Sequence, residues 1–449
     1  MLGGAVLGSP GAYAAMGTRK AAENQGRAKN VIFMVSDGMN MGALSLAKLY
    51  GGLVAEKKSH WLQIYRERAV VRCLAETYSA NSVVTDSAAA ASAWGGGERV
   101  NNGTINMRPD GSQLTPLLEK VQAQGIRMGL VTTATVTHAT PAGFAANVAS
   151  RGSEGEIAQQ YFDRKVDLLL GGGRKFFDPE LRGKFAEAGY DLVLDREGLK
   201  NLPPPTGEVK PLLGLFAEGY HAFDLDRKHL PDLAAKLPSL VEMTEAALGR
   251  LHGAKDGFFL MIEGARIDHA GHANDPAASI HDQMAFDDAV GTVRAFVEKN
   301  PDTLLIITTD HGCGGIQMNG VSADPKQGFG PGLYNATTAS FLRLKGFNRS
   351  LEWMGQNKVN AVSGPRLGEL WKEYTGLSIN EDQVKSLQGL KLRATSDLIK
   401  EYTGVGWTSA NHTSELVEFC AMGPGSHLFA PYLWNSEVHG LLLRAMEVG

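Results

Sequence analysis

The residues of this sequence best suited to chemistry are carboxylates and histidines that stand at or just after the ends of apolar segments. They are Asp37, Glu263, Asp268, His272, Asp310, His311 and His412. Asp268 and His272 are four residues apart, which places both side chains on one face of a helical turn. Four carboxylates gathered with three histidines would repel one another, or be desolvated, without a cation. We therefore expect a cluster of divalent metal ions at this place.

A candidate nucleophile is Ser87, in the stretch TDSAAAASAWGGG. This serine leads into a run of small helix-forming residues, so we expect it to open a short helix. The first N–H groups of a helix are unpaired and its dipole is positive there, which favours a phosphate and eases deprotonation of a hydroxyl. Taken alone, a serine before an alanine run is also typical of an ordinary helix cap. The acidic and histidine residues elsewhere favour the catalytic interpretation.

The elements that must position these residues are buried strands and amphipathic helices. Apolar runs of strand type are found at 30–35, 69–74, 128–132, 166–170, 258–262, 304–308 and 416–422. Helical patterns lie between them, including 114–124, 154–161, 240–251 and 277–298. This alternation predicts an α/β fold, a three-layer α/β/α sandwich around a large, mostly parallel sheet. In such sheets ligands bind beyond the carboxyl ends of the strands, where the acidic residues and histidines are expected.

Composition places limits on the class of protein. The chain has 449 residues, of which 43% are hydrophobic and 20% charged, enough for a large core. The formal net charge of −4 gives no indication of nucleic-acid binding. No apolar stretch reaches the roughly 18 residues of a membrane span. The three cysteines, Cys73, Cys313 and Cys420, form no metal-like pair, and we expect a structural role even for Cys313, which is close to Asp310 and His311.

The N-terminal segment has two interpretations. Residues 1–14 are small and apolar and end in Ala12-Tyr13-Ala14, which is similar to the end of a secretory signal with its cleavage site. The charged segment that should precede such a signal is missing, so residues 1–29 are either the remnant of a signal peptide or a disordered arm. We favour export, to the periplasm or the medium.

Ordered motifs along the chain resemble the alkaline phosphatase family, which belongs to a superfamily of metal-dependent enzymes that also holds phosphodiesterases and sulfatases. The motifs include VSDGM at Asp37, TDSAAAASAW at Ser87, HATPAGFAANVASR ending at Arg151, FFLMIEGARIDHAGH ending at His272, TTDHG at Asp310 and HTSE at His412. The resemblance runs from about residue 30 to 320 and resumes near 407.

The resemblance implies a site with two zinc ions, one magnesium ion and a phosphoserine intermediate. Asp268, His272 and His412 match the ligands of the first zinc, and Asp37, Asp310 and His311 match those of the second. The magnesium ligands correspond to Asp37, Thr140 and Glu263. Ser87 matches the nucleophile and Arg151 the arginine that holds phosphate. The implied substrates are small phosphate monoesters.

Two positions depart from the best-known enterobacterial members, where an aspartate and a lysine replace His138 and His269. Histidine at both positions is similar to animal enzymes instead. His138 puts a nitrogen beside the oxygen-rich magnesium site, which leaves the ion held there open. His269 is adjacent to Asp268, so it points off the face that Asp268 shares with His272. We expect both histidines to lie next to the metal ligands without binding metal themselves. His269 would contact either solvent or, through a water molecule, phosphate.

The segment between His311 and His412 is longer than the core fold should need. We expect residues 319–406 to form an inserted cap, and residues 30–318 and 407–449 to form the catalytic core. The cap could shape substrate access or a homodimer contact, and the sequence does not decide between the two.

Three functions remain open at this point. The favoured one is a phosphomonoesterase; the alternatives are a phosphodiesterase of the same superfamily and an inactive metal- or phosphate-binding protein. A sulfatase is disfavoured because no cysteine occupies the nucleophile position.

Overall fold

The computed structural model describes residues 26–67, 69–203, 209–319 and 337–449. Most of the N-terminal segment 1–29 and residues 320–336 of the expected cap therefore lie outside the described residues. No helix in the described part is long and apolar enough to cross a bilayer.

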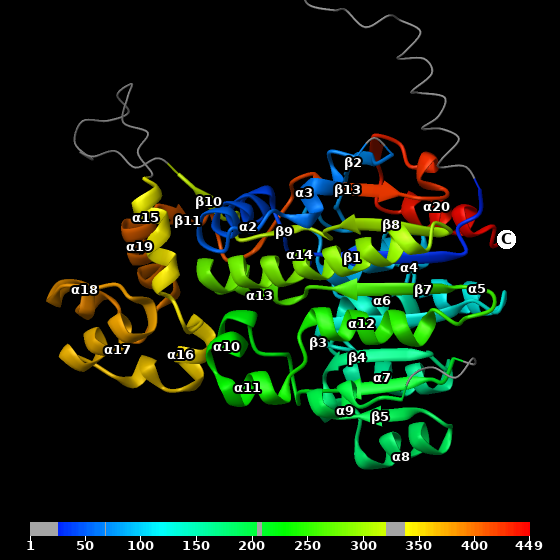
Figure 1. Ribbon diagram of the computed structural model, residues 1–449, viewed down its shortest axis with the longest axis horizontal. Coiled ribbons are helices and arrows are strands. Elements are labelled where there is room, and N and C mark those ends of the chain that lie inside the picture. The colour runs from blue at the N-terminus through cyan, green and yellow to red at the C-terminus, as the bar shows by residue number, and fades with distance from the viewer. Residues whose placement is uncertain (1–25, 68, 204–208, 320–336) are drawn as a thin grey trace, which may run out of the picture.

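The centre of the molecule is a ten-stranded sheet built from described residues (Figure 1). In spatial order its strands are β14 (Tyr432–Leu433), β2 (Val71–Ala75), β13 (Val417–Met422), β8 (Thr303–Thr308), β1 (Asn30–Val35), β7 (Phe258–Glu263), β3 (Arg127–Thr135), β4 (Leu168–Gly172), β6 (Leu212–Leu215) and β5 (Asp191–Val193). All neighbouring strands pair in parallel except β13, which is antiparallel to both β2 and β8. The mostly parallel sheet predicted from the sequence is confirmed.

Side chains alternate between the two faces of the sheet along each central strand, so the sheet contributes to two separate hydrophobic cores. In β1, Ile32 and Met34 join one core while Phe33 and Val35 join the other. The first core is covered by α2 (Met41–Val54), α3 (His60–Ile64), α9 (Arg196–Lys200), α12 (Leu240–Leu251) and α14 (Pro276–Lys299). The second is covered by α4 (Ser87–Gly96), α5 (Leu117–Gln122), α6 (Ala139–Ala145), α7 (Glu154–Asp163), α8 (Pro179–Glu187) and α20 (Glu437–Met446). Helices on both faces make the three layers that the sequence predicted.

Each predicted strand overlaps a strand of the sheet. The sequence pattern missed β5, β6 and β14, which are two to four residues long. Such short segments carry too few residues for an apolar run to be recognised.

The described part of the predicted cap, which we call the insert, is a group of short helices at the carboxyl end of the sheet (Figure 1). It is entered and left through a small ribbon in which β10 (Gln317–Met318) pairs antiparallel with β11 (Val405–Gly406). Its helices are α15 (Thr338–Leu342), α16 (Leu351–Gln356), α17 (Pro365–Thr375), α18 (Glu381–Ser386) and α19 (Leu392–Thr403). Its apolar side chains continue the core that α2 and α14 share.

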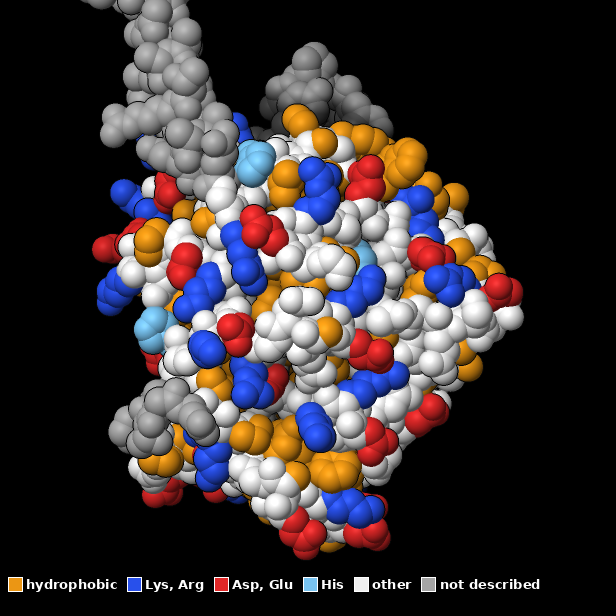
Figure 2. Space-filling model, turned by 90° about the vertical axis from the view of Figure 1, so that its right-hand side faces the viewer, with side chains coloured by type: hydrophobic (Ala, Val, Ile, Leu, Met, Phe, Trp, Pro, Cys, Tyr) orange, Lys and Arg blue, Asp and Glu red, His pale blue; other side chains and the backbone are white. Residues whose placement is uncertain are grey.

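The opposite end of the sheet, where the parallel strands begin, is shown in Figure 2. On the face in that view, basic and acidic side chains are intermingled, and no large region of one sign stands out. A nucleic-acid surface would need a continuous basic region. This face offers none.

Candidate active site

Ser87 is the first residue of α4, as the sequence predicted. The carboxylate of Asp86 caps the helix by accepting a hydrogen bond of 2.9 Å from the backbone N–H of Ala89. The Ser87 hydroxyl is therefore not used in capping, and its oxygen lies 3.2 Å from Nε2 of His311. Ser87 is 1% exposed and stands at the positive end of the helix dipole.

Small residues let α4 lie very close to α6. A side-chain carbon at Gly95 would stand 1.9 Å from the carbonyl oxygen of Gly143, so only glycine fits there. Every residue of α4 from Ser87 to Gly95 is buried. The nucleophile helix is thus fixed by close packing.

Arg151 lies in the turn before α7 and points back to the start of α4. One guanidinium nitrogen donates to Asp86 over 3.0 Å, and the other lies 3.1 Å from Nε2 of His138. Its side chain remains 29% exposed, so the fork is held in place yet can still receive a ligand. Burial, together with the nearby Arg151, lowers the pKa of His138 to about 3, so this imidazole is neutral.

The first cluster of donor atoms joins Asp268 and His272 of α13 (Arg266–His272) to His412 of β12 (His412–Thr413). The two Nε2 atoms of the histidines are 3.1 Å apart, and each lies 3.4 Å from an oxygen of Asp268. Ligands held about 2.0 Å from a tetrahedral zinc are about 3.3 Å apart. The second nitrogens are fixed by backbone oxygens, with His272 bonding Ala410 and His412 bonding Thr85. This spacing fits a zinc ion.

A second cluster shares Asp268 with the first, and its His311 contacts Ser87. Donor atoms of Asp37, Asp268 and His311 are all within 4.8 Å of one another. Nε2 of His311 is also 3.1 Å from Oδ2 of Asp310. The other carboxylate oxygen of Asp310, Oδ1, accepts hydrogen bonds from the backbone N–H groups of Gly38 and His311. Asp310 is thus oriented by the backbone of two strand ends.

The third cluster joins Asp37, His138 and Glu263, whose donor atoms are again within 4.8 Å. Thr132 donates a hydrogen bond of 2.5 Å to one oxygen of Glu263. The Thr140 hydroxyl and both oxygens of Asp37 are buried without a hydrogen bond of normal geometry to any described residue. Buried carboxylates are rarely left without partners, so these atoms point to a cation.

Electrostatics of the buried acids supports the same conclusion. Burial raises the pKa of Asp37 well above its usual range, and repulsion from Asp310 and Asp268 adds to the effect. Burial also raises the pKa of Glu263 to about 7. In contrast, the effect of burial on Asp268 is outweighed by the neighbouring imidazoles of His272 and His412, which hold the pKa of this carboxyl well below its usual range. Divalent cations would offset the repulsion at Asp37 and Glu263.

His269 stands outside these clusters, as its position on the helix predicts. Its ring stacks on that of Tyr220 with centroids 4.4 Å apart, and its Nδ1 lies 2.7 Å from a nitrogen of Arg266. Arg266 is only 1% exposed and also donates to Glu352 of the insert over 2.7 Å. Sequence reasoning missed this connection because Glu352 is remote in the chain and belongs to no motif.

Cys313 is the other residue that the sequence did not place in the site. Its sulfur is within 4.8 Å of the donor atoms of Asp268, His272 and His412. Burial, with the neighbouring Asp268 carboxylate, raises the pKa of this thiol. The expectation of a purely structural role did not anticipate this placement.

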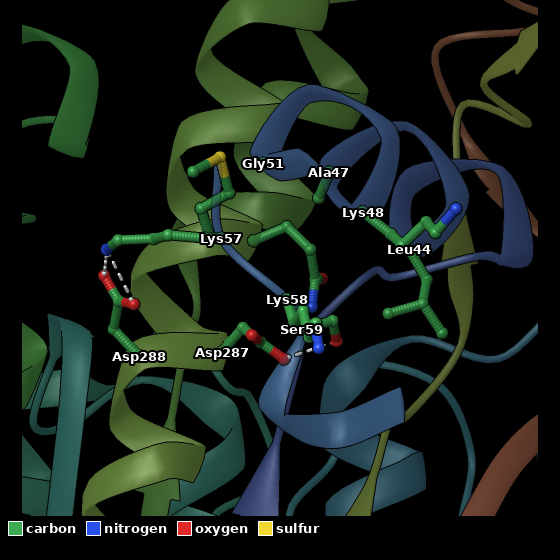
Figure 3. Close-up of a pocket in the computed structure, with 11 residues that line it drawn as sticks. Leu44, Ala47, Lys48, Gly51, Lys57, Lys58, Ser59, Asp287 and Asp288 are labelled. Atoms are coloured by element: carbon green, nitrogen blue, oxygen red, sulfur yellow. Dashed lines mark hydrogen bonds and ion pairs between the residues drawn. The ribbon is translucent and has the colours of Figure 1, made fainter. Parts of the chain in front are cut away.

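A pocket lies away from these residues, between α2, α14 and the segment that joins α2 to α3 (Figure 3). Lys57 bonds both oxygens of Asp288 at 3.0 Å, and Asp287 accepts from the Ser59 hydroxyl at 2.8 Å. Its acidic groups are thus already partnered. None of the predicted site residues lines it.

Comparison with known proteins identifies the family of this chain. A sequence model of the family described as alkaline phosphatase matches residues 28–448. Alkaline phosphatase 3 of Bacillus subtilis (strain 168) is 32% identical over 444 residues, covering 94% of this chain and 90% of the relative. Streptomycin-6-phosphate phosphatase of Streptomyces griseus is 34% identical, covering 69% of this chain and 80% of the relative.

Solved structures show the same fold. The crystal structure of Thermus thermophilus alkaline phosphatase matches with a TM-score of 0.84 and 28% identity, covering 99% of this chain and 96% of that chain. Because the family match extends over nearly the whole length and the relatives are named phosphatases, the chain belongs to the alkaline phosphatase family and is a phosphomonoester hydrolase.

Proposed function

We propose that the enzyme acts through a phosphoserine at Ser87, with two zinc ions and one magnesium ion bound to the three clusters. The observation that carries this proposal is the set of buried carboxylate oxygens, above all both oxygens of Asp37, that make no hydrogen bond of normal geometry to any described residue. Asp268, His272 and His412 would hold the first zinc, and Asp37, Asp310 and His311 the second. Asp37, Thr140 and Glu263 would hold magnesium, with His138 at the edge of that site.

Bound there, the ions would supply Lewis acidity toward the phosphate oxygens and lower the pKa of water. The chain's own residues supply the rest. The N-terminus of α4 stabilises negative charge on Ser87 Oγ, which attacks phosphorus as the ester oxygen leaves. Arg151, already oriented by Asp86, grips two phosphoryl oxygens with its planar fork. Water then hydrolyses the phosphoserine and frees inorganic phosphate.

The test compares initial rates for a chromogenic phosphate monoester and the matching diester, before and after exhaustive chelation. We expect the monoester to be hydrolysed much faster, activity to disappear with the chelator, and zinc with magnesium to restore it. Chelation should also lower the melting temperature, because the carboxylates would be left facing one another. Full activity in protein shown by metal analysis to be free of metal would contradict the proposal.

Assembly and location belong to the same proposal. We propose a homodimer that covers an apolar stripe on α2, where Met41, Leu49 and Leu53 are 44%, 37% and 50% exposed. Leu49 and Leu53 are one turn apart on the same face of the helix, and Met41 lies about two turns before Leu49. Leu49→Glu should shift the mass measured by light scattering from dimer to monomer.

For location we propose export, on the strength of the signal-like residues 1–14; cell fractionation checks it.

A further inference from the structure

Cys313 lies directly opposite His412 in the structure. β9 (Gly312–Cys313) pairs antiparallel with β12, and Cys313 and His412 are Cα partners in that register. Side chains of directly opposed residues stand on the same face, with Cβ atoms about 4.5–5.5 Å apart. The strand pair therefore presents the thiol from the same side as the imidazole of His412.

The helix on the other side of the cluster leaves space for this sulfur. Gly271 lies between Asp268 and His272 on α13, and a Cβ there would stand 2.9 Å from the Cys313 sulfur. Any larger residue at position 271 would push the thiol away. The close contact fixes Cys313 against the turn that carries two of the predicted ligands.

The four side chains together form one donor set. One atom each of Asp268, His272, Cys313 and His412 lies within 4.8 Å of the other three. Oδ1 of Asp268, a residue only 4% exposed, makes no hydrogen bond of normal geometry within the described part of the chain. Thiolate, imidazole and carboxylate are the ligands that zinc selects in proteins.

The geometry points to Cys313 Sγ as a fourth protein ligand of the zinc ion held by Asp268, His272 and His412. This inference rests on the proposed function, since it assumes that the first cluster holds zinc. On binding, the sulfur–hydrogen bond is replaced by a sulfur–metal bond and the proton passes to solvent. Zinc can expand from four ligands to five, so the thiolate does not by itself close the site to substrate. A soft sulfur ligand should also favour zinc or cobalt over magnesium in this cluster.

Cobalt(II) provides a direct test, because a thiolate bound to cobalt gives a strong charge-transfer band in the near ultraviolet. The full-length protein is stripped of metal, loaded with cobalt(II), and its cobalt content is measured alongside the spectrum. We expect the band in the parent protein and its loss in Cys313→Ser. Cys73→Ala and Cys420→Ala serve as matched controls, because both cysteines are buried and absent from the donor clusters; each should keep the band.

Competition with a chromogenic chelator gives a second readout that does not depend on activity. Cys313→Ser should lower the affinity of the tightest zinc site by at least about 10-fold. Losing a residue that only orients a ligand already lowers metal affinity by about 10-fold or more, and losing a ligand should cost no less. The control variants should bind zinc like the parent.

The outcomes separate this inference from the function on which it rests. Cobalt bound in the parent without a thiolate band, or a band that survives in Cys313→Ser, overturns ligation by Cys313 and leaves the zinc site standing. A parent protein that binds neither cobalt nor zinc overturns both. If Cys313→Ser fails to fold, the spectrum of the parent still decides whether a thiolate is bound.

Discussion

Ser87 Oγ and His311 Nε2 lie 3.2 Å apart although 224 residues separate them in the sequence. The contact joins the start of α4 to the segment that follows β8. It places the candidate nucleophile directly against the cluster of Asp37, Asp268 and His311.

Ser87→Ala should abolish formation of the phosphoenzyme and most of the monoesterase activity, because the nucleophile is lost while every predicted metal ligand remains. Trapping labelled phosphate on the protein at low pH measures the first effect. Metal analysis should find the same metal content in variant and parent. Normal labelling of the alanine variant would mean that another residue is the nucleophile.

His138→Asp should make the third site bind magnesium more tightly. A neutral imidazole contributes no negative charge, whereas an aspartate would add a carboxylate beside Asp37 and Glu263 that attracts a hard cation. The measurement is activity against magnesium concentration at fixed zinc. The variant should saturate at lower magnesium than the parent; coinciding curves would place His138 outside the electrostatic reach of that ion.

Glu352→Gln should loosen the insert from the active site. Glu352 pairs with Arg266, which is buried and also contacts His269, so the substitution leaves a buried guanidinium without its counter-charge. We expect a lower melting temperature and a changed KM for a bulky monoester. The control is Glu369→Gln, which removes the partner of Arg366 in an Arg–Glu pair of the same insert where both side chains are more than 60% exposed. Exposed pairs contribute little, so this variant should behave like the parent, and equal effects in both would argue against the link.

His439→Gln should flatten the dependence of stability on acid pH. Burial, with Lys120 nearby, lowers the pKa of His439 to about 4, whereas in an unfolded chain it is about 6.5. Between these values the unfolded state binds more protons than the native state, so stability falls as pH drops from about 6.5 to 4. One such proton gives a slope of about 1.4 kcal/mol per pH unit.

Urea unfolding of the metal-free protein between pH 4.5 and 7 measures this slope. The His439→Gln curve should be shallower than the parent's by up to one proton. His439 bridges the carbonyl oxygen of Trp94 in α4 and the Lys120 ammonium, so the variant should also be less stable at pH 7. Identical slopes would show that His439 keeps an ordinary pKa in the native state.

The fold class could be predicted from the amino-acid sequence, and so could the candidate residues of the site. Buried strands such as 30–35 and 304–308 are largely apolar because both faces of a central parallel strand pack against helices, and this pattern is visible without any tertiary contact. Because the carboxyl ends of such strands share one edge of the sheet, Asp37, Glu263 and Asp310 could be assigned to one place. Ser87 was recognisable because a helix start is a local feature.

Tertiary structure alone decided the relations between distant segments. The pairing of Cys313 with His412 depends on two-residue strands about a hundred residues apart, which leave no periodic pattern. Likewise, the ion pair of Arg266 with Glu352 joins α13 to the insert, and no local rule predicts which charge of the insert will meet a buried arginine. Such contacts are fixed by how whole elements pack, and packing depends on the shapes of many side chains at once.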